Sequence, residues 1–405
     1  MNILILTNIY PGPGMEKDNT PVVHYFTREW AAMGHKVYVV HYAANFPRPV
    51  MWAAALVKKP LAALLGTPVR TTIATEHEYT LEGVHVKCMP MTKYYLHAPY
   101  NKQCIDRAFH KTVSWLQQND FTPDIVSSHW VNPQVEIMLR LKQLYSIKAC
   151  YVAHIPPFEF ERIYSRQQTA KMLMQMDMIG FRSLQIKKEF ENQYKLPVQK
   201  FMCYSGVPES FLCANNIQKR QFNNVRSFIF VGAMYPRKHP DKVLEAVVQT
   251  YGKEPFRITF IGQGEMEKKI RNKAQRLGIS ESVHILGRQS REQVVRHLSQ
   301  NDVFIMISKK ETYGLVYLEA MAQGCITVAS RHEGFDGIIV DNQNGFLCKA
   351  GDTQELCGVI NKIRKMTSEE LCQISNEAIN TATALTDRNT ATTYLNNLTI
   401  SEPST

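Results

Sequence analysis

The sequence predicts an α/β protein with two domains, each built on a parallel β-sheet of the Rossmann-like kind. Short apolar runs of strand length alternate with segments of helical periodicity, which is the pattern of strand–helix–strand units. The 405 residues exceed what one hydrophobic core of ordinary size contains. A hydrophobic content of 44% and a charged content of 20% are those of a globular chain. We therefore expect two such domains in tandem.

Composition limits the classes of binding partner and the cellular compartment that we expect. A formal net charge of +11 indicates attraction to nucleotide phosphates, an acidic membrane surface or nucleic acid. Nucleic acid is the weakest of these, because zinc-finger spacing, a helix-turn-helix pattern and an aromatic RNA-binding motif are all missing. Nine cysteines without a C-x-x-C pair indicate free thiols in a reducing compartment. The start, MNILILTNIY, predicts a strand and not a signal peptide, and no apolar stretch has transmembrane length. We expect a cytoplasmic protein.

Strands and helices are expected to alternate through both domains. The first domain opens with a strand at 2–6, a Pro- and Gly-rich loop, and a helix that ends near Gly34. Further strands are predicted at 36–40, 84–89, 125–128, 147–153, 178–182, 227–231, 257–261, 283–286, 303–307 and 326–329. The predicted domains are 1–205 and 206–381, separated by a polar stretch. After a helix at about 352–380, a last helix at about 382–400 is expected to pack back on the first domain.

Residues 46–70 differ from both domains because they combine apolar and basic side chains. Trp52, Leu56 and Leu61 can form the apolar side of a surface helix on lipid, with basic residues near the headgroups. Pro60 would break or kink that helix. The same segment can equally be a helical insertion that packs on its own domain. Both interpretations stay open.

Two histidines follow predicted strands of the first domain. His129 comes directly after the strand 125–128, and His154 comes directly after the strand 147–153. The carboxyl ends of parallel strands meet at the edge where open α/β sheets bind ligands. A lone histidine is more often structural, but two at one edge make a better candidate for a site.

The stretch 302–330 carries the strongest chemical pattern. It predicts a strand, a polar loop with Glu311, a helix with Glu319 eight positions later, and a second strand. The helix N-terminus favours a phosphate, because it presents backbone N–H groups and a partial positive charge. A carboxylate on either side could accept hydrogen bonds from ribose and hexose hydroxyls. The arrangement suits a sugar nucleotide.

The run E-T-Y-G-L-V-Y-L-E-A-M-A, which begins at Glu311, resembles the E-x7-E motif of the retaining glycosyltransferases of family 4. That family has the GT-B fold, in which two Rossmann-like domains face each other across a cleft. The run G-A-M-Y-P-R-K-H resembles the family's phosphate-binding turn G-R-L-x-x-x-K-G, with Lys238 at the lysine. Ala233 stands where the family has arginine, and Arg237 is the candidate to replace it. S-G-V-P-E-S-F resembles the family's interdomain turn, with Ser205 in place of asparagine.

The resemblance implies that a hexose passes from a UDP- or GDP-sugar to a hydroxyl with retained configuration, without a metal or other cofactor. Glu311 would hydrogen-bond the donor sugar and Glu319 the ribose, while Lys238 with Arg237 would hold the diphosphate. His154 would orient the acceptor or the donor sugar, and His129 joins it as a candidate on the acceptor side. The remaining donor-site candidates are Thr312, Tyr313, Gly314, Leu315, Val316, Gly287 and Arg288. Gly12 and Gly14 either let the backbone approach a ligand at the cleft or form an ordinary turn.

Two other functions compete with transfer. A sugar-nucleotide epimerase on the same fold would need acid–base carboxylates in the first domain, where no persuasive pair occurs. A non-catalytic nucleotide-sugar-binding module is kept open by Ala233. The family resemblance favours a glycan or lipid-linked saccharide as acceptor, in polysaccharide or glycolipid biosynthesis. Because many similar enzymes use a lipid-linked acceptor, a peripheral location at the inner face of the membrane stays open beside the cytoplasm.

Overall fold

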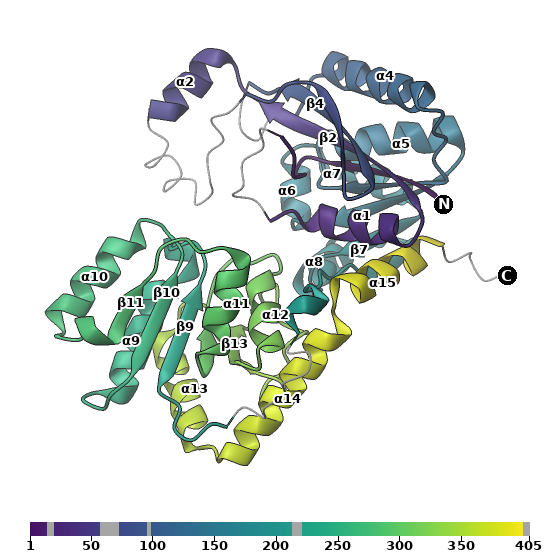
Figure 1. Ribbon diagram of the computed structural model, residues 1–405. Coiled ribbons are helices and arrows are strands. Elements are labelled where there is room, and N and C mark those ends of the chain that lie inside the picture. Colours follow the sequence, from purple (N-terminus) through teal and green to yellow (C-terminus); the bar gives the residue numbers. More distant parts are fainter. Residues whose placement is uncertain (14–19, 57–72, 95–98, 213–220, 400–405) are drawn as a thin grey trace. The chain divides into compact units, whose positions relative to one another are not determined.

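A computed structural model of the chain describes residues 1–13, 20–56, 73–94, 99–212 and 221–399 (Figure 1). The chain divides into two compact units. The N-terminal unit comprises Met1–Ser205 together with Asp387–Thr405, and the C-terminal unit comprises Gly206–Thr386. Each unit is built around its own β-sheet.

The N-terminal unit contains an eight-stranded sheet in the order β3-β4-β2-β1-β5-β6-β7-β8. Its strands are β1 Asn2–Thr7, β2 Lys36–Asn45, β3 His77–Leu81, β4 Val84–Thr92, β5 Ile125–His129, β6 Lys148–Ala153, β7 Met178–Phe181 and β8 Gln199–Met202. Its helices are α1 Val22–Ala32, α2 Arg48–Leu56, α4 Lys102–Gln118, α5 Gln134–Tyr145, α6 Pro157–Glu161, α7 Arg166–Met174, α8 Leu184–Gln193 and α15 Asp387–Thr399. All neighbouring strands are parallel except β3, which pairs antiparallel with β4.

Both faces of this sheet are buried, which explains why its strands are apolar at nearly every position. Successive side chains of β1 alternate between two cores: Ile3 and Ile5 belong to one, Leu4 and Leu6 to the other. Helices α1 and α15 cover the first core and lie side by side (Figure 1). Helices α4, α5 and α8 contribute to the second core. The last helix of the chain is therefore part of the N-terminal unit.

The C-terminal unit contains a fully parallel six-stranded sheet in the order β11-β10-β9-β12-β13-β14. Its strands are β9 Ser227–Val231, β10 Arg257–Ile261, β11 Val283–Ile285, β12 Val303–Ile305, β13 Ile326–Ser330 and β14 Phe346–Cys348. Its α-helices are α9 Pro240–Tyr251, α10 Met266–Arg276, α11 Arg291–Ser299, α12 Leu315–Ala322, α13 Thr353–Lys365 and α14 Ser368–Ala384. The short 3-10 helices are η1 Glu209–Phe211, η2 Pro236–Lys238 and η3 Ser280–Ser282.

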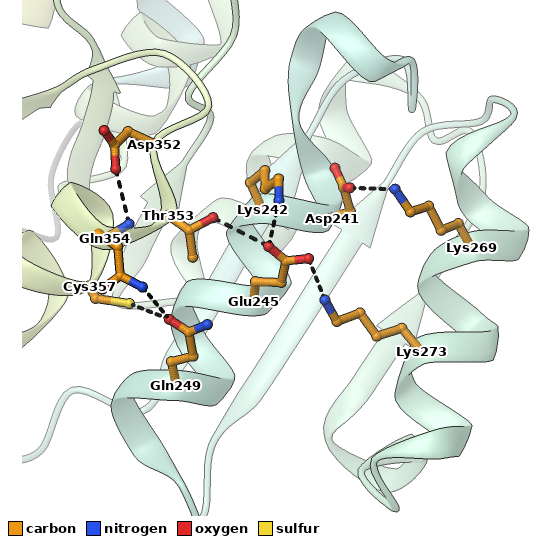
Figure 2. Close-up of polar contacts among 10 residues, drawn as sticks. All are labelled: Asp241, Lys242, Glu245, Gln249, Lys269, Lys273, Asp352, Thr353, Gln354 and Cys357. Atoms are coloured by element: carbon orange, nitrogen blue, oxygen red, sulfur yellow. Dashed lines mark hydrogen bonds and ion pairs between the residues drawn. The ribbon is translucent and has the colours of Figure 1, made fainter.

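Hydrogen bonds and ion pairs connect three helices of the C-terminal unit (Figure 2). Glu245 on α9 accepts from Lys242 at 2.8 Å, from Lys273 on α10 at 2.5 Å and from Thr353 on α13 at 3.3 Å. Burial alone would raise the pKa of Glu245, but the hydrogen bonds from the two lysines outweigh it and lower that pKa. The network holds α9, the helix that directly follows η2.

The structure differs from the sequence-based expectation at β3 and between α13 and α14. The antiparallel strand β3 was not predicted, because its polar, partly exposed residues do not form an apolar run. The helix expected at 352–380 is two helices, α13 and α14, since Thr367 forms a capping box that starts α14. Of the segment 46–70, residues 57–70 lie outside the described part of the chain, whereas α2 belongs to it. No helix among the described residues is both long and apolar enough to span a bilayer.

Candidate active site

The loops after β9 and β12 bring together the two residues on which the predicted donor site depends. The strands are neighbours in a parallel sheet, so their carboxyl ends share one edge. The Lys238 ammonium forms an ion pair with the Glu311 carboxylate. Only 11% and 13% of the two side chains are exposed. The Ser308 hydroxyl also donates to Glu311 Oε2, at 3.2 Å.

The pair is charged although it is largely buried. Burial alone would raise the pKa of Glu311, but the adjacent Lys238 ammonium, with a further contribution from Arg237, holds this pKa below its ordinary value. Glu311 is therefore a carboxylate at neutral pH. Arg237 also fixes the loop, since its backbone carbonyl accepts a hydrogen bond from Lys309 N at 2.7 Å. Its charge acts on Glu311 from a backbone position four residues beyond Ala233.

A further carboxylate, that of Glu333, lies beside this pair. Glu333 was not among the predicted site residues. It follows β13, and its Oε2 accepts from Glu311 N at 2.8 Å. Burial raises the pKa of Glu333, and the negative charge of Glu311 adds to that rise. The sequence signal for Glu333 was its place just after a predicted strand of the same sheet.

Gly314 opens the helix that carries the second predicted glutamate. It has φ +83° and ψ +71°, in the left-handed region that favours glycine. A Cβ atom there would lie 2.5 Å from the Tyr317 ring, whose hydroxyl donates to Met306 O at 2.6 Å. Thr312, Tyr313, Leu315 and Val316 flank Gly314 at the N-terminus of α12. The first N–H groups of a helix have no partner within it, so this end favours an anion.

Glu319 lies on α12 and is held by an arginine that the sequence pattern did not single out. Arg291 Nε donates to Glu319 Oε1 at 2.6 Å, and the guanidinium carbon lies 5.0 Å from the centre of the Phe211 ring. Glu319 is only 6% exposed. Arg291 is the first residue of α11, three positions after the predicted site residue Arg288, but its contact with Glu319 appears only in the folded structure.

Glycines allow the loops after β9 and β10 to pack against each other. A Cβ atom on Gly262 would lie 2.0 Å from Gly232 O, and one on Gly264 would lie 2.4 Å from Met234 O. Gly262 N in turn donates to the carbonyl of Gly287 at 2.8 Å. The predicted base-site residue Gly287 therefore lies next to these loops, with Arg288 exposed beside it.

In the N-terminal unit, the structure brings His129 and His154 into direct contact. His129 Nδ1 and His154 Nε2 are 2.8 Å apart, and the Trp130 ring stacks on His154 with a centroid distance of 4.1 Å. Burial lowers the pKa of His129 to about 3, and the positive charge of Arg182 lowers it further. Burial, His129 and Arg182 together hold the pKa of His154 well below its ordinary value. Both imidazoles are therefore neutral.

The predicted glycine loop after β1 is described only in part. Gly14 lies outside the described residues. Gly12 lies against Tyr79, and a Cβ atom there would be 2.3 Å from the Tyr79 hydroxyl oxygen. That hydroxyl donates to Pro11 O at 2.5 Å. Close packing against Tyr79 is thus one reason for glycine at this position.

The site chemistry of the two units is different. The C-terminal unit presents a lysine, carboxylates and a helix N-terminus at one sheet edge, whereas the N-terminal unit presents two neutral imidazoles. Among the described residues, no group of three or more His, Cys, Asp or Glu side chains is arranged to hold a metal ion.

Most of the C-terminal unit matches a known protein family. Residues 214–381 match the family glycosyl transferases group 1. The chain is 26% identical to an uncharacterised glycosyltransferase of Methanocaldococcus jannaschii over 58% of its own length and 63% of that protein's length. It is 31% identical to the N-acetyl-alpha-D-glucosaminyl L-malate synthase of Bacillus anthracis over 33% of its own length and 34% of that enzyme's length. The aligned regions thus span less than two thirds of either relative.

Solved structures match over the whole chain at low identity. Sucrose-phosphate synthase from Thermosynechococcus elongatus superimposes with a TM-score of 0.70 at 14% identity, over 98% of both chains. HepE of Anabaena, solved in complex with UDP, gives a TM-score of 0.66 at 15% identity, over 98% of this chain and 99% of that one. At such identities the likeness concerns the fold alone, and that fold is GT-B. The chain thus has the GT-B fold, and residues 214–381 of its C-terminal unit match the family glycosyl transferases group 1.

Proposed function

We propose that this protein is a retaining glycosyltransferase that moves a hexose from a UDP- or GDP-sugar to a hydroxyl of a glycan or lipid-linked saccharide. The observation that carries the proposal is the buried Lys238–Glu311 ion pair beside the N-terminus of α12. A leaving diphosphate gains negative charge during transfer, and a fixed cation next to helix amides stabilises it without reorganisation. The glycosyltransferase relatives and the UDP complex of a GT-B neighbour support the same substrate class.

In this proposal each group has one task. Lys238, with Arg237 beside it, binds the diphosphate together with the amides from Thr312 to Val316. Glu311, ionised beside Lys238, accepts hydrogen bonds from hydroxyls of the donor sugar. Glu319, oriented by Arg291, accepts from the ribose hydroxyls. Gly287 and Arg288 lie beside the nucleotide base, and His154 orients a sugar hydroxyl. The chain's own cations and helix amides stabilise the leaving diphosphate, and we propose that no metal or other cofactor is needed.

The Lys238–Glu311 pair also explains how the site stays intact before the donor arrives. A buried ammonium or a buried carboxylate alone would be costly, and each neutralises the other in the absence of ligand. A diphosphate can then take over part of the interaction with Lys238, which frees Glu311 for hydroxyl groups. This exchange of partners suits a site that binds an anion next to a polyol.

We further propose that the protein works in the cytoplasm, in polysaccharide or glycolipid biosynthesis, and contacts the inner face of the membrane through α2. Trp52 and Leu56 on this helix are 69% and 88% exposed, whereas Met51 is buried. Exposed Trp and Leu side chains insert at the boundary between headgroups and acyl chains, and the net charge of +11 favours anionic lipid.

Donor turnover tests the proposal directly. UDP- and GDP-hexoses are incubated with the protein in chelator, with and without saccharide acceptors, and release of free nucleotide is measured. We expect one donor class to be consumed, with the anomer retained in the product by proton NMR. Glu311→Gln should lower the rate roughly 100-fold. The matched control, Glu267→Gln, removes a surface ion pair with Arg271 and should leave the rate unchanged. Nucleotide binding without turnover would favour a binding module, and inverted product would contradict retention.

A further inference from the structure

The C-terminal helix α15 inserts one hydroxyl group behind the histidine pair of the N-terminal unit. Tyr394 on α15 is 1% exposed, and Phe26, Trp30 and Phe201 surround its ring. The helix is fastened nearby, since Trp30 Nε1 donates to Ala391 O at 2.8 Å. The tyrosine hydroxyl lies 2.6 Å from Ser127 Oγ and 3.4 Å from His129 Nε2.

These contacts form a continuous chain of hydrogen bonds from a strand to His154. The Cys150 carbonyl is 3.2 Å from Ser127 Oγ. Ser127 Oγ contacts Tyr394, Tyr394 contacts His129 Nε2, and His129 Nδ1 contacts His154 Nε2. The far nitrogen of His154, Nδ1, has no hydrogen-bond partner among the described residues. It is the end of the chain of contacts.

The direction of the hydrogen bonds follows from the fixed end. A carbonyl can only accept, so the Ser127 hydroxyl donates to Cys150 O. Ser127 Oγ then accepts the Tyr394 O–H, and the Tyr394 oxygen accepts from His129 Nε2–H. His129 Nδ1 is left without a proton, and it accepts from His154 Nε2–H. This direction makes four hydrogen bonds, apart from those of the Cys150 thiol, a weak donor that lies beside the Ser127 and Tyr394 hydroxyls and can donate in either direction. The reverse direction makes three, because Ser127 then donates to Tyr394 and its contact with Cys150 O is lost.

We propose that Tyr394 is a positioning residue that holds His154 in the tautomer with the proton on Nε2, so that Nδ1 is a hydrogen-bond acceptor for a substrate hydroxyl. The tautomer is a property of the free protein, whereas its use on a sugar hydroxyl rests on the proposed function. A neutral imidazole with a fixed tautomer distinguishes a hydroxyl that donates from a group that can only accept. Burial raises the pKa of Tyr394 well above its ordinary value, so its hydroxyl proton is always present to be donated.

The tautomer is measured by long-range proton–nitrogen NMR correlation on the full-length protein labelled with ¹⁵N-histidine. His129→Gln and His154→Gln assign the two rings. In the wild type we expect Nε2 protonated and Nδ1 unprotonated in both rings. Tyr394→Phe should let a second tautomer appear in both. Ser127→Ala should reverse both tautomers, because the tyrosine hydroxyl loses its acceptor and turns to His129 Nε2.

Tyr42→Phe is the matched control. Tyr42 is also fully buried, but its hydroxyl bonds to Thr112 Oγ1 at 2.8 Å and it belongs to the core on the other face of the sheet. It should leave both tautomers unchanged. A proton on His154 Nδ1 in the wild type, or identical histidine spectra in wild type and both Tyr394→Phe and Ser127→Ala, would overturn the proposal. If one variant fails to fold, the wild-type tautomer and the other variant still decide it.

Kinetics then separate this inference from the proposed function. On the preferred donor, Tyr394→Phe should lower kcat about 10-fold while KM for the nucleotide sugar changes less than about twofold. Absence of turnover in the wild type would count against the proposed function and leave the tautomer result standing. Unchanged kcat with a disturbed tautomer would contradict the role of Nδ1 on the substrate.

Discussion

The two units use opposite solutions for polar groups buried at the carboxyl edge of a parallel sheet. In the C-terminal unit Lys238 and Glu311 have opposite charges, and the lysine holds the pKa of Glu311 low despite burial. In the N-terminal unit His129 and His154 would carry like charges beside Arg182, and both stay neutral. A buried group is thus stabilised either by a partner of opposite charge or by losing its own charge. The first solution suits an anionic ligand, and the second suits a hydroxyl.

Removing the cation should have the largest effect, because it leaves Glu311 buried without its partner and takes away the proposed ligand of the diphosphate. We expect Lys238→Ala to lower the rate of sugar transfer roughly 100- to 1,000-fold. Lys269→Ala is the control, since Lys269 forms an ion pair with Asp241 at 2.8 Å on the helices of Figure 2. Equal rates for Lys238→Ala and Lys269→Ala would show that the charge of Lys238 does not contribute to sugar transfer.

Low pH should weaken the C-terminal unit through Glu311. Its pKa is lower in the folded protein than its ordinary value of 4.5, so the ion pair contributes stability above that value. The contribution is lost as the pH falls through the lowered pKa. We expect urea unfolding of the wild type to lose more free energy between pH 5 and pH 3 than that of Glu311→Gln. Parallel pH profiles would show that the carboxylate is not stabilised by its surroundings.

Acidification should destabilise the N-terminal unit through its histidine pair, at a higher pH than it destabilises the C-terminal unit through Glu311. In the unfolded chain a histidine gains its proton near pH 6.5, whereas folded His129 does so only near its pKa of about 3. The contribution of His129 is therefore complete above pH 6.5 and falls below it. Between pH 7 and 5.5 we expect the wild type to lose about 1 kcal/mol more than His129→Gln. A constant difference between the two proteins would mean that folded His129 keeps the ordinary histidine pKa.

Arg291 offers a smaller test of the C-terminal site. Arg291→Ala removes the hydrogen bond to Glu319 at 2.6 Å, so the carboxylate that we propose to bind the ribose is no longer held in place. We expect KM for the nucleotide sugar to rise about 10-fold with little change in kcat, since binding in the ground state is affected. An unchanged KM with a lower kcat would place Glu319 in the transfer step.

Helix α2 should affect membrane binding alone. We expect the double variant Trp52→Ser, Leu56→Ser to bind vesicles of phosphatidylglycerol and phosphatidylcholine several-fold less than the wild type, by sedimentation. Leu144→Ser is the control, because Leu144 is a 53% exposed leucine on α5 of the same unit. Nucleotide binding should be unchanged in both. If the double variant bound the vesicles as well as the wild type and Leu144→Ser do, α2 would have no role in membrane binding.

Local patterns in the sequence were enough for the α/β class with two parallel sheets, because buried parallel strands are continuous apolar runs separated by helices. The GT-B fold was predicted from the resemblance of the run that begins at Glu311. The ion pair of Lys238 with Glu311 joins two motifs, each of which was visible on its own. Arg291 and Tyr394 could not be predicted in this way. Their partners, Glu319 and His129, are 28 and 265 positions away, and only tertiary packing brings them together. The polar strand β3 was missed because propensity does not reveal pairing with a neighbour.

Binding of free nucleotides tests the charged site most directly. UDP, GDP and ADP are titrated by calorimetry in chelator into wild type, Lys238→Ala and Lys269→Ala. We predict a Kd on the order of micromolar for one of UDP and GDP, weakened at least about 10-fold in Lys238→Ala and unchanged in Lys269→Ala. Absence of binding for all three nucleotides, or equal binding by wild type and Lys238→Ala, would contradict a diphosphate site at the Lys238–Glu311 pair.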